Sequence, residues 1–242
     1  MAKSGRSRRP ARADAGAGAG PGPEAGPTFG EVLEAAGLVE QTARATRHVI
    51  DQSNAAALAH AGRTGAVVSC LDCTAPKACC TLTTSAYLHE AIPIAARLRR
   101  EGRDTPALRD ALRAAAHRME TTPASRYQAP CVFLDEGERC TVYEERPSVC
   151  GTHLVSSPAA ACSDPTVASI VKLVGTLQDR APPEIDAQLT MRAGLRPLDR
   201  SYRGALPRMV LLCLEAWPRR DYVSFLGERV LAAAHRFAAA TR

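Results

Sequence analysis

The sequence predicts a mainly α-helical protein whose helices surround a small, irregular cysteine-rich metal core containing a β-hairpin. Alanine is abundant, whereas aromatic residues make up only 4% of the 242 residues. Alanine has the highest helix propensity, while aromatic and β-branched residues favour strands. Eight of the nine cysteines fall into two groups between Cys70 and Cys162, and these groups mark the predicted core. A chain of this length can bury a core without needing metals or disulfides merely to fold.

Residues 1–27 form a low-complexity tail of alanine, glycine, proline and arginine. The tail cannot bury enough apolar surface to offset the entropy of ordering, so we expect it to be disordered. It holds five basic and two acidic side chains, and therefore half of the net charge of +6. Residues 28–242 are predicted to form a single α-rich domain, with the cysteine core at about 66–163.

The first predicted helical region runs from Thr28 to about His60. Apolar residues recur there at three- and four-residue steps. Thr28 is a suitable N-cap, with Glu31 at the capping-box spacing. Gly37 is expected to divide the region into two pieces, and Gly62–Gly65 to end it.

Two further helices are predicted between the cysteine groups. One reaches about residue 100 and holds Pro93, either as a kink or in its first turn. The Thr105-Pro106 dipeptide supplies an N-cap and a first helical position for the next helix, which reaches about Met119.

Residues 131–143 are predicted to form the β-hairpin of the core. The runs Val-Phe-Leu and Thr-Val-Tyr favour strands, and Asp135–Glu138 forms the turn between them. A short turn or helix that begins at Glu144 is expected to carry Cys150.

The remaining chain is predicted to be helical. We expect helices from Asp164 to about Leu177, around Glu184–Met191, and at Leu206–Ala216 and Arg219–Thr241. The Asp164-Pro165 pair caps the first of these, and Trp217-Pro218 separates the last two.

The two cysteine groups indicate a metal site. Cysteine thiolate is a preferred ligand of Zn²⁺ and of iron–sulfur clusters, and two cysteines spaced as Cys70 and Cys73 can face one ion from a tight turn. Closing the hairpin brings Cys131 and Cys140 near one another. The predicted metal ligands are Cys70, Cys73, Cys79, Cys80, Cys131, Cys140, Cys150 and Cys162.

Several alternatives stay open at this level. Eight thiolates suffice for two four-cysteine sites, or for one four-ligand centre such as a 4Fe–4S cluster, and zinc and iron both fit. His153 has metal-ligand spacing to Cys150 and is an alternative ligand. Cys213 lies on an apolar helical face and is interpreted as core. Lys77, Arg139 and Arg146 are candidates for offsetting the negative charge of the thiolates.

Both cysteine groups together resemble the pattern of a known family, and the second group is the more specific part. The residues Cys70-x2-Cys73-x5-Cys79-Cys80, then Cys131-x-Phe-Leu and Cys140-Thr-Val-Tyr-Glu-x-Arg-Pro-x-x-Cys150, resemble the bacterial YkgJ-like cysteine-cluster family, described as a zinc- or iron-chelating domain. The resemblance implies that the seven cysteines from Cys70 to Cys150 chelate zinc or iron. The family commonly has an arginine after the last cysteine, where this chain has Gly151. A similar cysteine domain occurs in flagellin lysine N-methylases.

Three functions compete on this evidence. The first is a cytoplasmic metal-binding protein of unassigned biochemical role. The second is an enzyme, either an iron–sulfur redox protein or a protein lysine N-methylase. The third is a zinc module that binds nucleic acid or a protein partner. No Gly-rich phosphate loop and no nucleophile–base spacing is present, so no catalytic residue is assigned.

The composition limits the expected cellular location of the protein and the classes of partner that it can bind. No stretch approaches about 18 consecutive apolar residues, so no transmembrane helix is expected. The tail is a poor signal peptide, which makes the cytoplasm the expected location and keeps the thiols reduced. The rest of the chain lacks a basic run with interleaved aromatics, so only the basic tail would attract nucleic acid, and weakly. The sequence names no specific partner.

Overall fold

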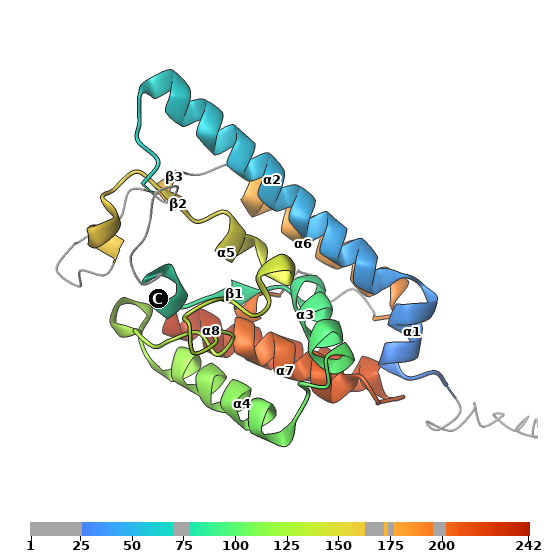
Figure 1. Cartoon of the computed structure of the whole chain (residues 1–242). Helices are drawn as coiled ribbons and strands as arrows, with labels where there is room; N and C mark the ends of the chain where they lie inside the picture. Colours follow the sequence, from blue (N-terminus) through green and yellow to red (C-terminus); the bar gives the residue numbers. More distant parts are fainter. Residues whose placement is uncertain (1–25, 70–77, 163–171, 174–176, 196–201) are drawn as a thin grey trace, which may run out of the picture.

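The structure is a computed structural model that describes residues 26–69, 78–162, 172–173, 177–195 and 202–242 (Figure 1). The predicted mainly α-helical class is confirmed over these residues. The helices are α1 (Phe29–Ala35), α2 (Leu38–Thr64), α3 (Leu88–Arg100), α4 (Pro106–Thr121), α5 (Ser148–Gly151), α6 (Leu177–Arg192), α7 (Leu206–Ala216) and α8 (Tyr222–Ala240). Single turns of 3₁₀ helix are η1 (Ala78–Thr81), η2 (Ala124–Arg126), η3 (Tyr143–Glu145) and η4 (Ala159–Cys162). Residues 1–25 of the predicted disordered tail lie outside the described part.

The N-terminal helices begin and divide at the predicted residues, and α2 ends within the predicted Gly62–Gly65 segment, beyond His60. Thr28 Oγ1 accepts a hydrogen bond from Glu31 N at 3.3 Å, and Glu31 Oε2 accepts one from Thr28 N at 2.7 Å. This reciprocal pair is the predicted capping box. Gly37 has a φ of +59° and separates α1 from α2, because a left-handed residue cannot continue a helix. Gly65, with a φ of +68°, caps α2, whose last residue, Thr64, lies four residues beyond His60.

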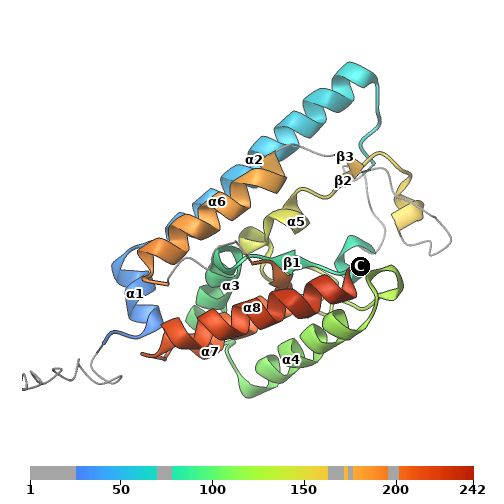
Figure 2. The ribbon, with the colours of Figure 1, turned by 180° about the vertical axis from the view of Figure 1, so that it is seen from behind.

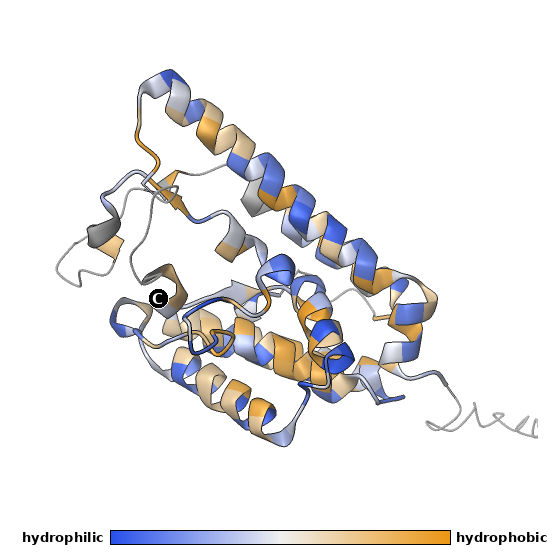
Figure 3. Ribbon diagram, viewed as in Figure 1, coloured by the Kyte–Doolittle hydropathy of each residue, from blue (hydrophilic) through white to orange (hydrophobic). Residues whose placement is uncertain are grey.

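The core lies among α1, α3, α4, α7 and α8. Figures 1 and 2 show α7 packed between α3, α4 and α8, and these helices contact it directly. Nine of the eleven residues of α7 are buried, so the helix is apolar around most of its circumference (Figure 3). Cys213 is fully buried there, at 0% exposure, and the prediction that it belongs to the core is confirmed.

The second part of the fold is the pair of α2 and α6, which lie side by side in both views (Figures 1 and 2). The predicted short helix at Glu184–Met191 is confirmed as the C-terminal half of α6. A buried polar contact joins α6 to α3. Asp186 Oδ1 accepts a hydrogen bond from His89 N at 3.1 Å and lies 3.1 Å from His89 Nδ1.

Two short antiparallel strand pairs connect these parts. β1 (Ser85–Ala86) pairs with β4 (Gly204–Ala205), and β2 (Leu154–Val155) pairs with β3 (Lys172–Leu173). The prediction of a helix from Asp164 to Leu177 is wrong at β3, while residues 163–171 and 174–176 lie outside the described part. The physical reason is tertiary, because β3 pairs with β2 and the buried Leu173 packs against α2.

Among the described helices, none combines the length and the apolar character that a membrane crossing requires.

Candidate metal centre

The hairpin that carries Cys131 and Cys140 forms, but without regular strands. Its two arms share one antiparallel bridge, between Leu134 and Cys140. The carboxylate of Asp135 accepts hydrogen bonds from the backbone N–H groups of Gly137 and Arg139, both at 2.9 Å. The Asp135 side chain therefore organises a tight turn, and the chain reverses in a hairpin of turns instead of the two predicted strands.

The first cysteine group is attached to the hairpin through the backbone. Cys79 and Cys80 lie in η1, a single 3₁₀ turn. The carbonyl of Cys80 accepts a hydrogen bond from Cys131 N at 2.9 Å, and the carbonyl of Thr81 accepts one from Ala129 N at 3.1 Å. These two bonds place η1 beside the arm that carries Cys131.

Cys150 lies in α5, as predicted for a short helix after Glu144. Both ends of α5 are held by other helices. Glu90 Oε1 of α3 accepts a hydrogen bond from Ser148 N at 2.8 Å, and Asn54 Nδ2 of α2 donates one to Gly151 O at 3.0 Å. The helix is only four residues long, so these contacts rather than its own ladder fix its position.

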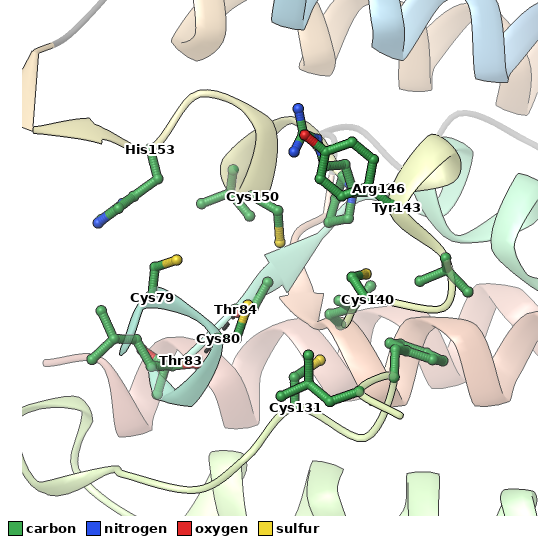
Figure 4. Close-up of a pocket in the computed structure, with 17 residues that line it drawn as sticks. Cys79, Cys80, Thr83, Thr84, Cys131, Cys140, Tyr143, Arg146, Cys150 and His153 are labelled. Carbon is green, nitrogen blue, oxygen red and sulfur yellow. Dashed lines mark hydrogen bonds between the residues drawn. The ribbon is translucent and has the colours of Figure 1, made fainter. Parts of the chain in front are cut away.

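These segments enclose one pocket with a volume of about 240 Å³. Its lining includes five of the predicted ligands, and Figure 4 shows their side chains around a common space. They are Cys79, Cys80, Cys131, Cys140 and Cys150. His153 lines the same pocket, and the remaining wall is largely apolar, with Leu82, Phe133 and Val149.

The other cysteine predictions have different outcomes. Cys70 and Cys73 lie outside the described residues. Cys162 lies half-buried in η4 and is not among the residues that line the pocket. The structure therefore brings together cysteines that are up to 71 positions apart in the sequence, from Cys79 to Cys150.

The donor chemistry of the pocket fits a thiophilic metal, because sulfur ligands select zinc and iron over hard cations. The described residues do not form a closed coordination shell. In the part of the chain that the structure describes, no three or more His, Cys, Asp or Glu side chains are grouped as an ion would need. The five thiols of the pocket are the candidate ligand atoms among the described residues.

The thiols of the pocket differ in acidity. A hydrogen bond from Cys79 lowers the pKa of Cys80, whereas burial raises the pKa of Cys131 and of Cys150. Cys150 as a whole residue is exposed, although burial is the main cause of the raised pKa of its thiol. Cys80 is therefore the first of these three thiols to become a thiolate, which is the ligand and nucleophile form.

The basic side chains predicted near the centre are placed differently. Arg146 lines the pocket, and its guanidinium lies 4.0 Å from the ring centroid of Tyr143. Arg139 points to solvent and pairs with Asp135. Lys77 lies outside the described residues.

The raised pKa values of the Cys131 and Cys150 thiols should make the stability of the metal-free, reduced protein depend on pH. A thiol whose pKa is higher in the folded than in the unfolded state stabilises the fold while it is protonated. This contribution is fully present below the ordinary thiol pKa and is lost as the pH rises through the pKa of the folded state. We expect a melting temperature insensitive to these thiols below about pH 8 and falling above it. Thermal melts between pH 7 and pH 10 measure this. A Cys131→Ala, Cys150→Ala variant should show a shallower fall, and an equal slope in both proteins would contradict the assignment.

Gly151 is where the resembled family commonly has arginine, and the structure explains the departure. A Cβ on Gly151 would lie 2.5 to 2.8 Å from three carbons of the Ile50 side chain on α2. Ile50 therefore occupies the space that a side chain at this position would need, and α5 packs closely on α2.

Gly151→Ala is expected to lower the free energy of unfolding by about 1–3 kcal/mol, because the added methyl overpacks this contact. Urea denaturation measures the loss. Gly62→Ala is the matched control, since nothing lies within 4 Å of its would-be Cβ, and it should stabilise α2 by up to about 1 kcal/mol. Equal effects of the two substitutions would refute the packing argument.

Sequence reasoning did not identify Glu90, Asn54 or Ile50 as residues that hold the centre. All three lie on helices remote in sequence from α5, and their types give no local signal. A glutamate inside a predicted helix is normally read as solvent-facing, and only the tertiary structure shows that Glu90 is buried.

Comparison with known proteins agrees with the resemblance. Residues 69–168 match the family model described as "CxxCxxCC: Putative zinc- or iron-chelating domain", which is the YkgJ-like family. This match contains the hairpin, α5 and every cysteine of the pocket. Searches among curated proteins and among solved structures gave no match.

Proposed function

We propose that the cysteine pocket binds zinc or iron through thiolates, because residues 69–168 match the model of a zinc- or iron-chelating domain. The proposed ligands within the described residues are Cys79, Cys80, Cys131, Cys140 and Cys150. Cys70 and Cys73, which belong to the same spacing pattern, complete the proposed set. His153, which lines the pocket, is a further candidate, while Cys162 has weaker support because it does not.

The observation that carries the proposal is the convergence of five cysteines on one solvent-accessible pocket. Cys213 shows how a cysteine that serves only as a small apolar group is placed, fully buried within α7. Cys79 and Cys150 are exposed, and the other three are half-buried. Cys131 and Cys140 also pack against the main core, but all five cysteines line one pocket, and bound metal would offset the repulsion between their thiolates.

A titration of the metal-free, reduced protein with Co²⁺ tests the proposal. Cobalt substitutes for zinc in tetrahedral thiolate sites, and the sulfur-to-cobalt charge-transfer absorption reports how many thiolates bind. We expect saturable binding with strong thiolate absorption, reversed when Zn²⁺ is added. A spectrum that stays that of hydrated cobalt would reject a thiolate metal centre in this pocket.

A metal-dependent enzyme is the second candidate, favoured by the open volume beside the thiols. Structural zinc sites are closed by four protein ligands, whereas catalytic sites keep a position for water or substrate. Azide added to the cobalt-loaded protein distinguishes these cases. A spectral change would indicate an exchangeable position and support catalysis, while an unchanged spectrum would support a structural centre. The lysine N-methylase and iron–sulfur redox alternatives both belong to this second candidate.

A further inference from the structure

Glu90 is a buried carboxylate beside the pocket that the sequence does not mark as functional. Its exposure is 2%, although it lies in the first turn of α3. Carboxylates are rarely this buried unless their oxygens are satisfied by donors. What satisfies Glu90 therefore indicates what it does.

Both oxygens of Glu90 accept backbone hydrogen bonds at the beginnings of two helices. Oε2 accepts from Tyr87 N at 2.9 Å, which is the capping-box bond of α3 itself. Oε1 accepts from Ser148 N at 2.8 Å, across 58 residues of sequence. Ser148 is the first residue of α5, so one carboxylate joins the N-terminus of α3 to the N-terminus of the helix that carries Cys150.

The contact lies close to the thiols. Burial is the main cause that raises the pKa of Cys150, and the charge of Glu90 acts in the same direction. At the other end of α5, Asn54 and Ile50 hold Gly151. A four-residue helix fixed at both ends cannot shift its cysteine without breaking one of these contacts.

We propose that Glu90 is a positioning residue of the metal centre: its bond to Ser148 N holds α5 so that Cys150 faces the other thiols. The inference rests on the proposed metal-binding function. Residues that orient metal ligands without touching the metal typically contribute 10–100-fold to metal affinity. Glu90 would orient Cys150 indirectly, because it binds the backbone N–H of Ser148, two residues before Cys150 in the sequence.

Glu90→Gln tests the contact with little change of shape. Glutamine keeps one accepting oxygen, which can preserve the capping box, but its NH₂ group cannot accept from Ser148 N. Ser148→Pro removes the same bond from the other side, because proline has no N–H and is tolerated at a first helical position. Ser148→Ala keeps the N–H and controls for loss of the hydroxyl.

Zn²⁺ dissociation constants, measured by competition with a chelator, are expected to rise about 10- to 100-fold in Glu90→Gln and in Ser148→Pro. The double variant should be no weaker than the weaker single variant, because both changes remove one bond. Ser148→Ala should bind Zn²⁺ like the wild type. Wild-type affinity in Glu90→Gln, or effects that multiply in the double variant, would overturn the proposal.

Glu120→Gln controls for general destabilisation. Glu120 is another buried carboxylate, held by Arg208 and Arg236, and none of these three residues lines the cysteine pocket. The Glu120→Gln variant should be less stable than the wild type but bind zinc equally well. A loss of zinc affinity as large as that in Glu90→Gln would overturn a specific role for Glu90.

Amide hydrogen exchange at Ser148 in the metal-free protein separates this inference from the proposed function. Faster exchange in Glu90→Gln supports the positioning contact even if the wild type binds no zinc, whereas unchanged exchange overturns it. Failure of the wild type to bind either zinc or iron would reject the proposed function alone.

Discussion

A Cys131→Ala, Cys150→Ala variant is expected to bind Zn²⁺ more than about 100-fold more weakly than the wild type. Loss of groups that merely orient a ligand costs 10–100-fold, and loss of two ligands should exceed that. The two cysteines come from the hairpin arm and from α5, so the variant removes donors from two sides of the pocket. Competition titration against a chelator under reducing conditions measures the change.

Cys213→Ala is the matched control for that variant. Cys213 is a cysteine of the same chain, but it lies in the core of α7 and does not line the pocket. Its removal should cost some stability through a small cavity and leave zinc affinity unchanged. Equal zinc affinity in the double variant and the wild type would show that the pocket is not the binding site.

Glu120→Ala is expected to lower the free energy of unfolding by about 3–5 kcal/mol, the usual cost of removing one partner of a buried ion pair. The Glu120 side chain is 2% exposed, and its two oxygens accept from Arg208 Nε at 2.9 Å and Arg208 Nη2 at 3.0 Å. Arg236 Nε adds a third bond at 3.0 Å. Without Glu120, the Arg208 side chain, which is 17% exposed, loses the carboxylate with which it forms this ion pair.

Urea denaturation of Glu120→Ala and Asp110→Ala measures this difference. Asp110 pairs with Arg113 in an exposed ion pair on α4, which should contribute no more than about 1 kcal/mol. A loss in Glu120→Ala as small as that in Asp110→Ala would contradict the account of the buried network.

The helices could be predicted from the sequence because their signals are local. Thr28 with Glu31, Thr105 with Pro106, and the interruption at Trp217-Pro218 each act within one turn of the helix end that they define. The predicted strands of the hairpin and the predicted helix at residues 164–177 show the limit of local signals. The runs around Phe133 favour strands, yet the Asp135 turn leaves only one bridge, and β3 forms because β2 lies beside it.

The candidate site, like the fold, could be predicted only in part from the sequence. Spacing and residue type were sufficient to nominate the cysteines, and the fold places five of them around one pocket. Cys162 belongs to the same sequence group but lies apart from the pocket lining, because spacing alone does not fix where a loop goes. The contacts that hold α5 could not be predicted, since Glu90 and Asn54 reach it from helices 58 and 97 residues away.

Metal analysis of the anaerobically purified wild-type protein, together with its visible absorption spectrum, tests the central claim most directly. We predict zinc or iron bound in a stoichiometric amount, and its loss in the Cys131→Ala, Cys150→Ala variant. A colourless zinc protein would favour a structural or partner-binding centre, and a brown iron protein a redox enzyme. Wild-type protein that is folded, fully reduced and free of both metals, and that takes up neither when supplied with them, would contradict the claim.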